Sequence, residues 1–227
     1  MNDSEAMTDP ASARRIEARW PVVLAILSVI VLLTAMPGRI RIFPAWFPFL
    51  LGSLVIVPTA VCGFVPGKPL WLRIERLLTL LFFVVTLLGS IVSQANLITA
   101  MISRSSGISG VQLLTSSIAV WVTNVLAFSL LYWQMDRGGP EARTGGIRVK
   151  PDWLFPQGGA SPEEFPMDWS PTFLDYLSLG FNTSTAFSPT DVLPLTRRAK
   201  MLMMIESSIS LVTIVVVASR AINILGG

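Results

Sequence analysis

The chain has 227 residues, of which 52% are apolar and 14% are charged, and its formal net charge is +3. With a mean hydropathy of +0.64, this composition is typical of a polytopic membrane protein whose main partner is the lipid bilayer. The sequence contains no histidine and one cysteine, which excludes a disulfide within the chain, the usual His/Cys metal and haem sites, and histidine-dependent triads. No basic patch interleaved with aromatic residues indicates a nucleic-acid partner.

Residues 1–19 are small, polar and charged, and we expect them to form a disordered tail. Residues 20–133 then contain four apolar segments, which we interpret as membrane spans. The first follows three arginines, as a signal peptide would, but Thr34, Ala35 and Met36 make a poor cleavage site and other spans follow. The predicted spans cover residues 20–36, 43–64, 77–102 and 111–133.

Two of these spans carry side-chain amides: Gln94 and Asn96 in the third, and Asn124 in the fourth. In hydrocarbon such groups face a partner helix or water, so they indicate helix packing first and a permeation path second. Tyr132 and Trp133 end the fourth span, where an aromatic pair is typical of the membrane interface.

Residues 134–169 form a polar segment rich in glycine and proline. The segment is too short to build a second hydrophobic core. It nevertheless carries four large aromatic residues, which we expect to lie on the membrane surface or to cap the helix ends: Trp153, Phe155, Phe165 and Trp169.

Residues 170–227 begin with a short apolar segment, 171–181. Ser170 before Pro171 predicts a helix start, with a capping side chain ahead of a residue that needs no amide hydrogen bond. A segment this short does not cross a hydrocarbon layer of about 30 Å, so it predicts a re-entrant helix that enters the membrane and turns back.

The stretch 182–191 is rich in hydroxyl groups, and we expect it to be non-helical. A last span is predicted from Thr196 to Leu225. The sequence as a whole therefore predicts an all-α integral membrane protein with about five transmembrane helices and one short re-entrant, pore-like helix.

The order of elements in residues 170–225 resembles the pore module of the tetrameric potassium-channel superfamily. In that family an aromatic-rich pore helix leads into a Thr-Val-Gly-Tyr-Gly-Asp filter, which is followed by a hydrophobic pair, Pro, Leu, Thr and the inner helix. When Asp191 is placed on the filter aspartate, the same tail appears as Val192, Leu193, Pro194, Leu195 and Thr196. Glu206 then matches a glutamate of the inner helix. We call the corresponding residues the filter-like loop: Thr185, Ala186, Phe187, Ser188, Pro189, Thr190 and Asp191.

Both filter glycines are replaced in this loop, and Pro189 removes a backbone amide. Because the glycines let neighbouring carbonyls converge on one ion, any conduction is expected to be weakly selective among monovalent cations. The resemblance implies a homo-oligomer, since one pore module does not close a pore. The whole chain also resembles an uncharacterised bacterial family of multi-span proteins, which implies a bacterial inner membrane.

Two acidic residues are candidate functional groups. Glu206 lies about ten residues into the last span, where an isolated carboxylate is costly. It is a cation or proton site, a brace for the pore helix, or a glutamate that packs helices through hydrogen bonds. Its expected partners are hydroxyl groups of the stretch 182–191. Asp191 either belongs to an acidic ring at a pore mouth or caps the following turn.

The distribution of the 17 basic residues predicts the topology. If the amino terminus is cytoplasmic, five spans place 13 of them on that side: Arg14, Arg15, Arg19, Lys68, Arg73, Arg76, Arg137, Arg143, Arg148, Lys150, Arg197, Arg198 and Lys200. The other side receives four: Arg39, Arg41, Arg104 and Arg220. This bias favours a cytoplasmic amino terminus. It also places the pore-like loop on the cytoplasmic side, opposite to its side in a potassium channel.

Three functions are compatible with these patterns. The first is a homo-oligomeric, channel-like pore, and the second is a non-conducting structural or interaction protein. A small transporter is less favoured because the two halves show no internal repeat. We find no enzyme signature and no cofactor motif.

Overall fold

The structure is a computed structural model. It describes residues 18–38, 41–64, 69–102, 109–144, 149–159, 161, 163, 169–188 and 191–225. The predicted tail up to residue 17, the aromatic residue Phe165, and Pro189 and Thr190 of the filter-like loop lie outside the described residues.

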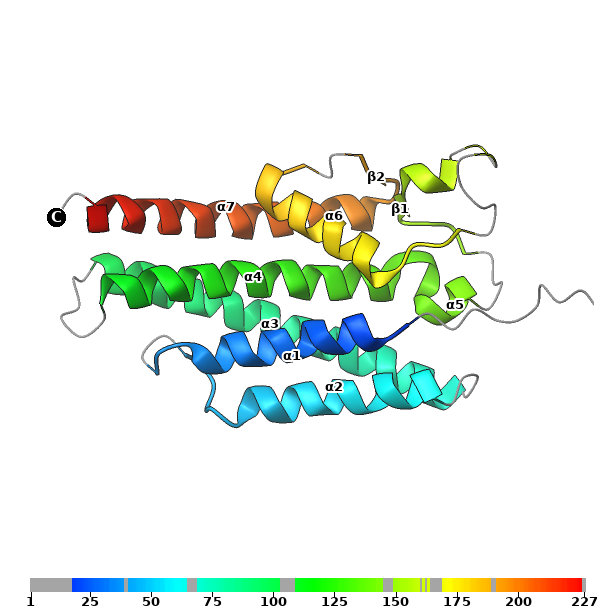
Figure 1. Cartoon of the computed structure of the whole chain (residues 1–227), viewed down its shortest axis with the longest axis horizontal. Coiled ribbons are helices and arrows are strands. Elements are labelled where there is room, and N and C mark those ends of the chain that lie inside the picture. The colour runs from blue at the N-terminus through cyan, green and yellow to red at the C-terminus, as the bar shows by residue number, and fades with distance from the viewer. Residues whose placement is uncertain are drawn as a thin grey trace, which may run out of the picture.

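The described chain is built from α-helices with one very short pair of strands (Figure 1). The helices are α1 (Trp20–Ala35), α2 (Phe47–Phe64), α3 (Pro69–Ile102), α4 (Gly110–Met135), α5 (Pro140–Thr144), α6 (Phe173–Ala186) and α7 (Arg197–Leu225). The strands are β1 (Trp153–Leu154) and β2 (Leu193–Pro194), and short 3₁₀ turns lie at Asp136–Gly138 and Pro156–Gly159.

Among the described helices, α2, α3, α4 and α7 are long and apolar enough to cross a membrane. The apolar helix α1 is shorter, with 16 residues. The chain is therefore an all-α, multi-pass membrane protein, as the hydropathy of the sequence predicts.

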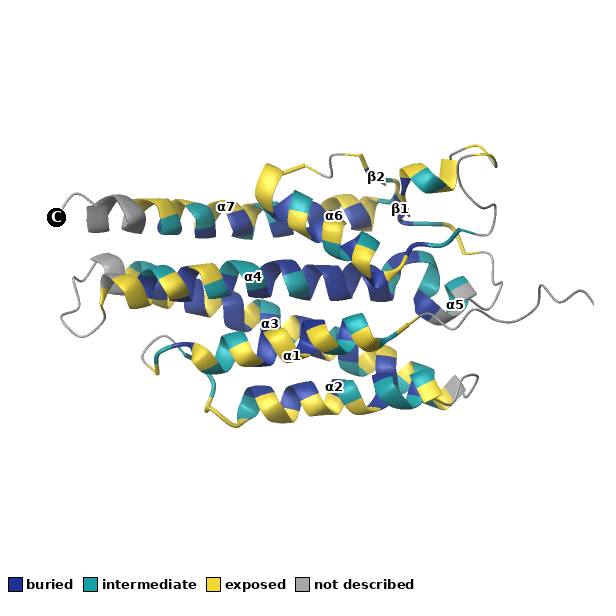
Figure 2. Cartoon of the chain, viewed as in Figure 1, coloured by how far each residue is buried: buried dark blue, intermediate teal, exposed yellow. Residues whose placement is uncertain are grey.

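Helix α4 is the centre of the bundle. It packs against α1, α3, α6 and α7, while α2 packs against α1 and α3. Figure 2 shows buried residues along much of α4, whereas α1, α2 and α7 each expose one side. The exposed sides are apolar, as expected for helices surrounded by lipid.

The long helices begin or end together at one end of the bundle, which we call the basic end. Helices α1, α3 and α7 begin there and α2 and α4 end there (Figure 1). Described cations near it include Arg19, Arg73, Arg76, Arg137, Arg143, Lys150, Arg197, Arg198 and Lys200. The carboxy-terminal end of α7 lies at the opposite end of the bundle from the start of α1.

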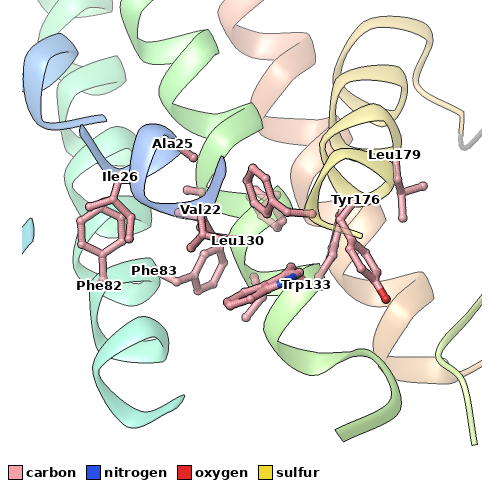
Figure 3. Close-up of a cluster of buried hydrophobic side chains, with 14 of the residues drawn as sticks. Val22, Ala25, Ile26, Phe82, Phe83, Leu130, Trp133, Tyr176 and Leu179 are labelled. Carbon is pink, nitrogen blue, oxygen red and sulfur yellow. The ribbon is translucent and has the colours of Figure 1, made fainter. Parts of the chain in front are cut away.

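The largest buried side chains gather near the basic end (Figure 3). Trp133 of α4 is fully buried, with its ring 6.3 Å from that of Phe173 in α6. Tyr132 is also fully buried. The pair was predicted to lie at the membrane interface, and the structure shows that both rings pack inside the protein, Tyr132 against Trp153 and Trp133 against Phe173.

Helix α3 begins at Pro69, earlier than the predicted start at Leu77. The additional turns contain Glu75, which is 1% exposed and forms an ion pair with Arg19. The Arg19 guanidinium also lies 6.0 Å from the centre of the Trp133 ring. The pairing compensates the buried charge of Glu75, which would be costly to bury alone.

The polar segment after α4 folds back onto the end of the bundle. Three consecutive residues with positive φ turn the chain there: Arg137 (52°), Gly138 (81°) and Gly139 (100°). Trp153 and Phe155 further along are buried in the core, and the Trp169 ring lies 6.0 Å from that of Phe155. Of the two expectations for these aromatic residues, the structure places Trp153 and Phe155 as a cap over the helix ends.

Helix α6 starts later and ends later than predicted. Its amino-terminal cap is at Thr172 and not at Ser170, because the Asp175 carboxylate accepts bonds from the Thr172 backbone N–H (2.7 Å) and hydroxyl (2.9 Å). The helix continues through residues 182–186, which were expected to be non-helical. They remain helical because Thr183 and Ser184 are buried against neighbouring helices, and Phe187 then ends the helix with φ 54°.

Helix α6 has 14 residues, about half the length of α7, which has 29. It begins near the basic end, and the chain after it returns to the basic end through β2 (Figure 1).

Candidate functional site

Glu206 is the central residue of the candidate site. It is fully buried, and both of its carboxyl oxygens accept hydrogen bonds. The Tyr132 hydroxyl of α4 lies 2.5 Å from Oε2, and the Ser184 hydroxyl of α6 lies 2.9 Å from Oε1. One α7 side chain therefore joins α4, α6 and α7.

These bonds explain how a carboxyl group is tolerated inside an apolar bundle. An unpartnered buried carboxyl costs several kcal/mol, and hydrogen bonds to both oxygens offset much of that cost. The expectation that a hydroxyl from residues 182–191 reaches Glu206 is confirmed by Ser184, although that serine is helical. Tyr132 was missed, because it was assigned to the membrane interface.

A close helix contact supports the same junction. Gly180 lies one turn before Ser184 on the buried face of α6, and a Cβ at this position would be 2.5 Å from the Ser129 hydroxyl. It would also be 3.4 Å from Oε1 of Glu206. The Ser207 hydroxyl of α7 donates to the Thr183 carbonyl of α6 at 3.2 Å. Glycine thus lets α6 approach α4 and α7 closely enough for these bonds.

The polar face of α7 continues away from the basic end. Asn124 donates from Nδ2 to the Ser210 hydroxyl at 2.9 Å and to the Glu206 carbonyl at 3.5 Å. Gln94 donates to the Ile209 carbonyl at 3.1 Å and to the Thr213 hydroxyl. Because residues 206, 210 and 213 share one face of α7, these contacts form a polar ladder between α7 and its neighbours.

The amides of Gln94 and Asn124 are thus used to pack helices. Asn96 differs from them, because its side chain is exposed on the surface of α3. The sequence pattern alone does not separate these amides, since all three lie within apolar spans.

The filter-like loop is not a single extended strand. Thr185 and Ala186 form the last turn of α6, and the Thr185 hydroxyl bonds to the Phe181 carbonyl at 2.7 Å. The side chains of Phe187, Ser188 and Asp191 that follow are exposed. The described part of the loop therefore lies at the surface of one copy of the chain, at the end of a half-length helix.

The chain after the loop is bound to the polar segment. Leu193 and Pro194 pair with β1, and the Leu195 N–H donates to the Asp152 carbonyl at 2.8 Å. The Thr196 hydroxyl caps α7 by accepting from the Ala199 N–H at 3.2 Å, which agrees with the predicted start of this helix.

Two buried aspartates of the basic end were not singled out from the sequence. Asp136 accepts from the Asp152 N–H and from the Tyr176 hydroxyl, each at 2.7 Å. Asp152 accepts two 2.6 Å bonds from the Arg198 guanidinium. Their partners lie in chain segments 16 to 46 residues away, so the residues next to each aspartate in the sequence do not indicate the pairing.

Among the residues the structure describes, no group of three or more His, Cys, Asp or Glu side chains is placed to hold a metal ion. Met203 of α7 is buried, and its sulfur accepts a 3.3 Å hydrogen bond from the Trp153 indole. The arrangement therefore supplies hydrogen-bonded helix contacts and an exposed polar loop. Comparison with known protein families, curated proteins and solved structures finds no match for the chain.

Proposed function

We propose that the chain is one protomer of a homo-oligomeric, channel-like membrane protein. In this proposal α4, α6 and α7 act as the outer helix, pore helix and inner helix of a pore module. The permeating species are monovalent cations, discriminated weakly. The observation that carries the proposal is the junction at Glu206, which holds the half-length helix α6 against both long helices and leaves the described part of the filter-like loop exposed at its end.

The exposed side of α6 and α7 is the surface on which copies of the chain would meet. It presents large apolar side chains on α7 and aromatic ones around the end of α6: Met204, Ile205, Leu211, Val212, Val215, Phe181 and Phe187. The polar ladder faces the interior of the protomer, so the proposed pore lies between copies and is lined by the loop and by this side of α7.

The proposed location is a bacterial inner membrane, with the amino terminus cytoplasmic.

A second candidate is a non-conducting structural or interaction protein with the same architecture. It is favoured by the amides of Gln94 and Asn124, which bond within the protomer and therefore stabilise the bundle without any ion. A buried hydrogen-bonded network of this kind specifies one packing arrangement.

Cation flux into vesicles separates the two candidates. The purified chain is reconstituted, and potassium and sodium entry is measured before and after a membrane-impermeant thiol reagent. Because Cys62 is buried, the unmodified chain serves as the background for introduced cysteines. Thr185→Cys introduces an exposed thiol at the first residue of the filter-like loop. Ser28→Cys, on the exposed side of α1, is the matched control.

The proposal predicts flux that the reagent reduces in Thr185→Cys and leaves unchanged in Ser28→Cys. A strictly monomeric chain without flux would support the second candidate and refute the first. Flux that the thiol reagent leaves unchanged in both variants would place the pathway away from the filter-like loop.

A further inference from the structure

The return of the chain from the filter-like loop is held by a segment far away in the sequence. Strand β2 pairs with β1 through only two residue pairs, Trp153 with Pro194 and Leu154 with Leu193. A two-stranded ladder of this length is not stable by itself in water. Other contacts of the polar segment must therefore keep β2 in place, and we call residues 150–155 the latch segment.

The first anchor of the latch segment is ionic. The Asp152 carboxylate is fully buried and accepts 2.6 Å bonds from Nε and Nη2 of Arg198. The Thr196 hydroxyl donates to the same carboxylate at 2.6 Å. A bidentate guanidinium–carboxylate pair is among the strongest side-chain contacts, and this one spans from the latch segment to the first turn of α7.

The second anchor is aromatic and lies deeper. Asp136 at the end of α4 accepts from the backbone N–H groups of Asp152 (2.7 Å) and Trp153 (3.4 Å). The Trp153 ring is fully buried, with its centre 4.7 Å from that of Tyr132, the residue that bonds Glu206. The latch segment therefore contacts both the return of the loop and the junction that holds α6.

We propose that the latch segment is a conformational latch that holds residues 191–196, through which the chain returns from α6 to α7. The two anchors differ in exposure: the Trp153 side chain is fully buried, whereas the Arg198 side chain is 51% exposed. Local opening starts where contacts are fewest and most exposed, so the Asp152–Arg198 pair releases first. Release detaches β2 and frees residues 191–196, while Trp153 keeps its place on Tyr132. An effect of this release on ion flux rests on the proposed function, whereas the release itself does not.

Thiol accessibility at Val192 tests the latch in the full-length protein. Val192 precedes β2 and is buried, so Val192→Cys reacts slowly with a maleimide while β2 is docked. Arg198→Gln breaks the pair, and Arg197→Gln removes the neighbouring exposed charge without touching Asp152. We expect Val192→Cys to react at least about tenfold faster when combined with Arg198→Gln, and at an unchanged rate with Arg197→Gln. Asp152→Asn is expected to act like Arg198→Gln.

The buried thiol of Cys62 reports global unfolding in the same samples. Equal Val192→Cys rates in the Arg198→Gln and Arg197→Gln backgrounds would overturn the latch. A rise in Cys62 labelling that matches the rise at Val192→Cys would also overturn it, because the opening would then be global. A selective rise at Val192→Cys in a chain that shows no flux would support the latch and refute the pore.

Discussion

The Tyr132 hydroxyl donates a 2.5 Å hydrogen bond to Oε2 of Glu206, and this contact links the central helix α4 to the last helix α7. Both side chains are fully buried, and Ser184 of α6 completes the group at 2.9 Å. The half-length helix is thus held by a carboxyl group that accepts from two different helices. The stability of this junction is the basis of the first prediction.

Glu206→Leu is expected to lower the stability of the bundle, whereas Glu206→Gln is expected to be much milder. Leucine leaves the Tyr132 and Ser184 hydroxyls buried without an acceptor, at a cost of about 1–3 kcal/mol each. Glutamine keeps an acceptor oxygen and similar volume. The measurement is thermal unfolding in detergent, together with the oligomeric state. Ser208→Ala is the control, because this exposed hydroxyl bonds only to Met204 of its own helix. If Glu206→Leu melted like the natural chain, the junction would not contribute to stability.

The contact between Asn124 and Ser210 is expected to show direct energetic coupling. Hydrogen bonds between membrane helices average about 0.6 kcal/mol in double-mutant cycles. A cycle of Asn124→Ala and Ser210→Ala should give a coupling of that size in unfolding experiments. The parallel cycle of Asn124→Ala and Ser208→Ala should give none, since Ser208 is exposed on another side of α7. Equal couplings in the two cycles would contradict the polar ladder.

Gly180→Ala is expected to destabilise the chain by about 1–3 kcal/mol, because an added methyl group overpacks a filled helix contact. The new Cβ would lie 2.5 Å from the Ser129 hydroxyl and 3.3 Å from the Val125 carbonyl. Ser129→Ala in the same chain should recover part of the loss by removing the nearer atom. Gly159→Ala is the control, because a Cβ there meets nothing within 4 Å. Similar melting temperatures for the Gly180 and Gly159 variants would show that α6 moves freely against α4.

Tags at the two termini are expected to report opposite sides of the membrane, with the amino terminus cytoplasmic. The reason is the distribution of 13 basic residues against four under the positive-inside rule. The side on which each tag lies is measured from its accessibility in intact and in permeabilised cells. Tags on one side, or in the reverse order, would mean that α1 does not cross or that the charge rule fails for this chain.

Any conduction is expected to discriminate little between potassium and sodium. Thr185 and Ala186 are helical and Phe187 is exposed, so these positions do not form a row of carbonyls around one ion. Reversal potentials under bi-ionic conditions in planar bilayers provide the measurement. A strong potassium preference would contradict the proposed arrangement of the loop.

The sequence by itself determined the spans, because hydropathy is a local property that neighbouring residues share. The spans predicted at 43–64 and 111–133 and from Thr196 correspond closely to α2, α4 and α7. The span predicted at 77–102 lies within α3, which begins earlier, at Pro69, and carries Glu75 in its additional turns. The cation that pairs with Glu75 is Arg19, 56 residues away in the sequence.

Only the tertiary structure decided how the polar residues are used. The sequence indicated that Glu206 is a carboxyl group in need of partners, and Ser184 lies within the stretch expected to supply one. By contrast, no residue near Tyr132 or Asp152 in the chain indicates what either side chain binds. Residues 182–186 looked like a loop because their hydroxyls have no evident use in an isolated helix. Packed against α4 and α7, the hydroxyl of Ser184 and the carbonyl of Thr183 gain hydrogen-bond partners, and the helix continues. Hydrogen bonds between distant segments depend on which helices pack side by side, and that is settled only when the whole bundle folds.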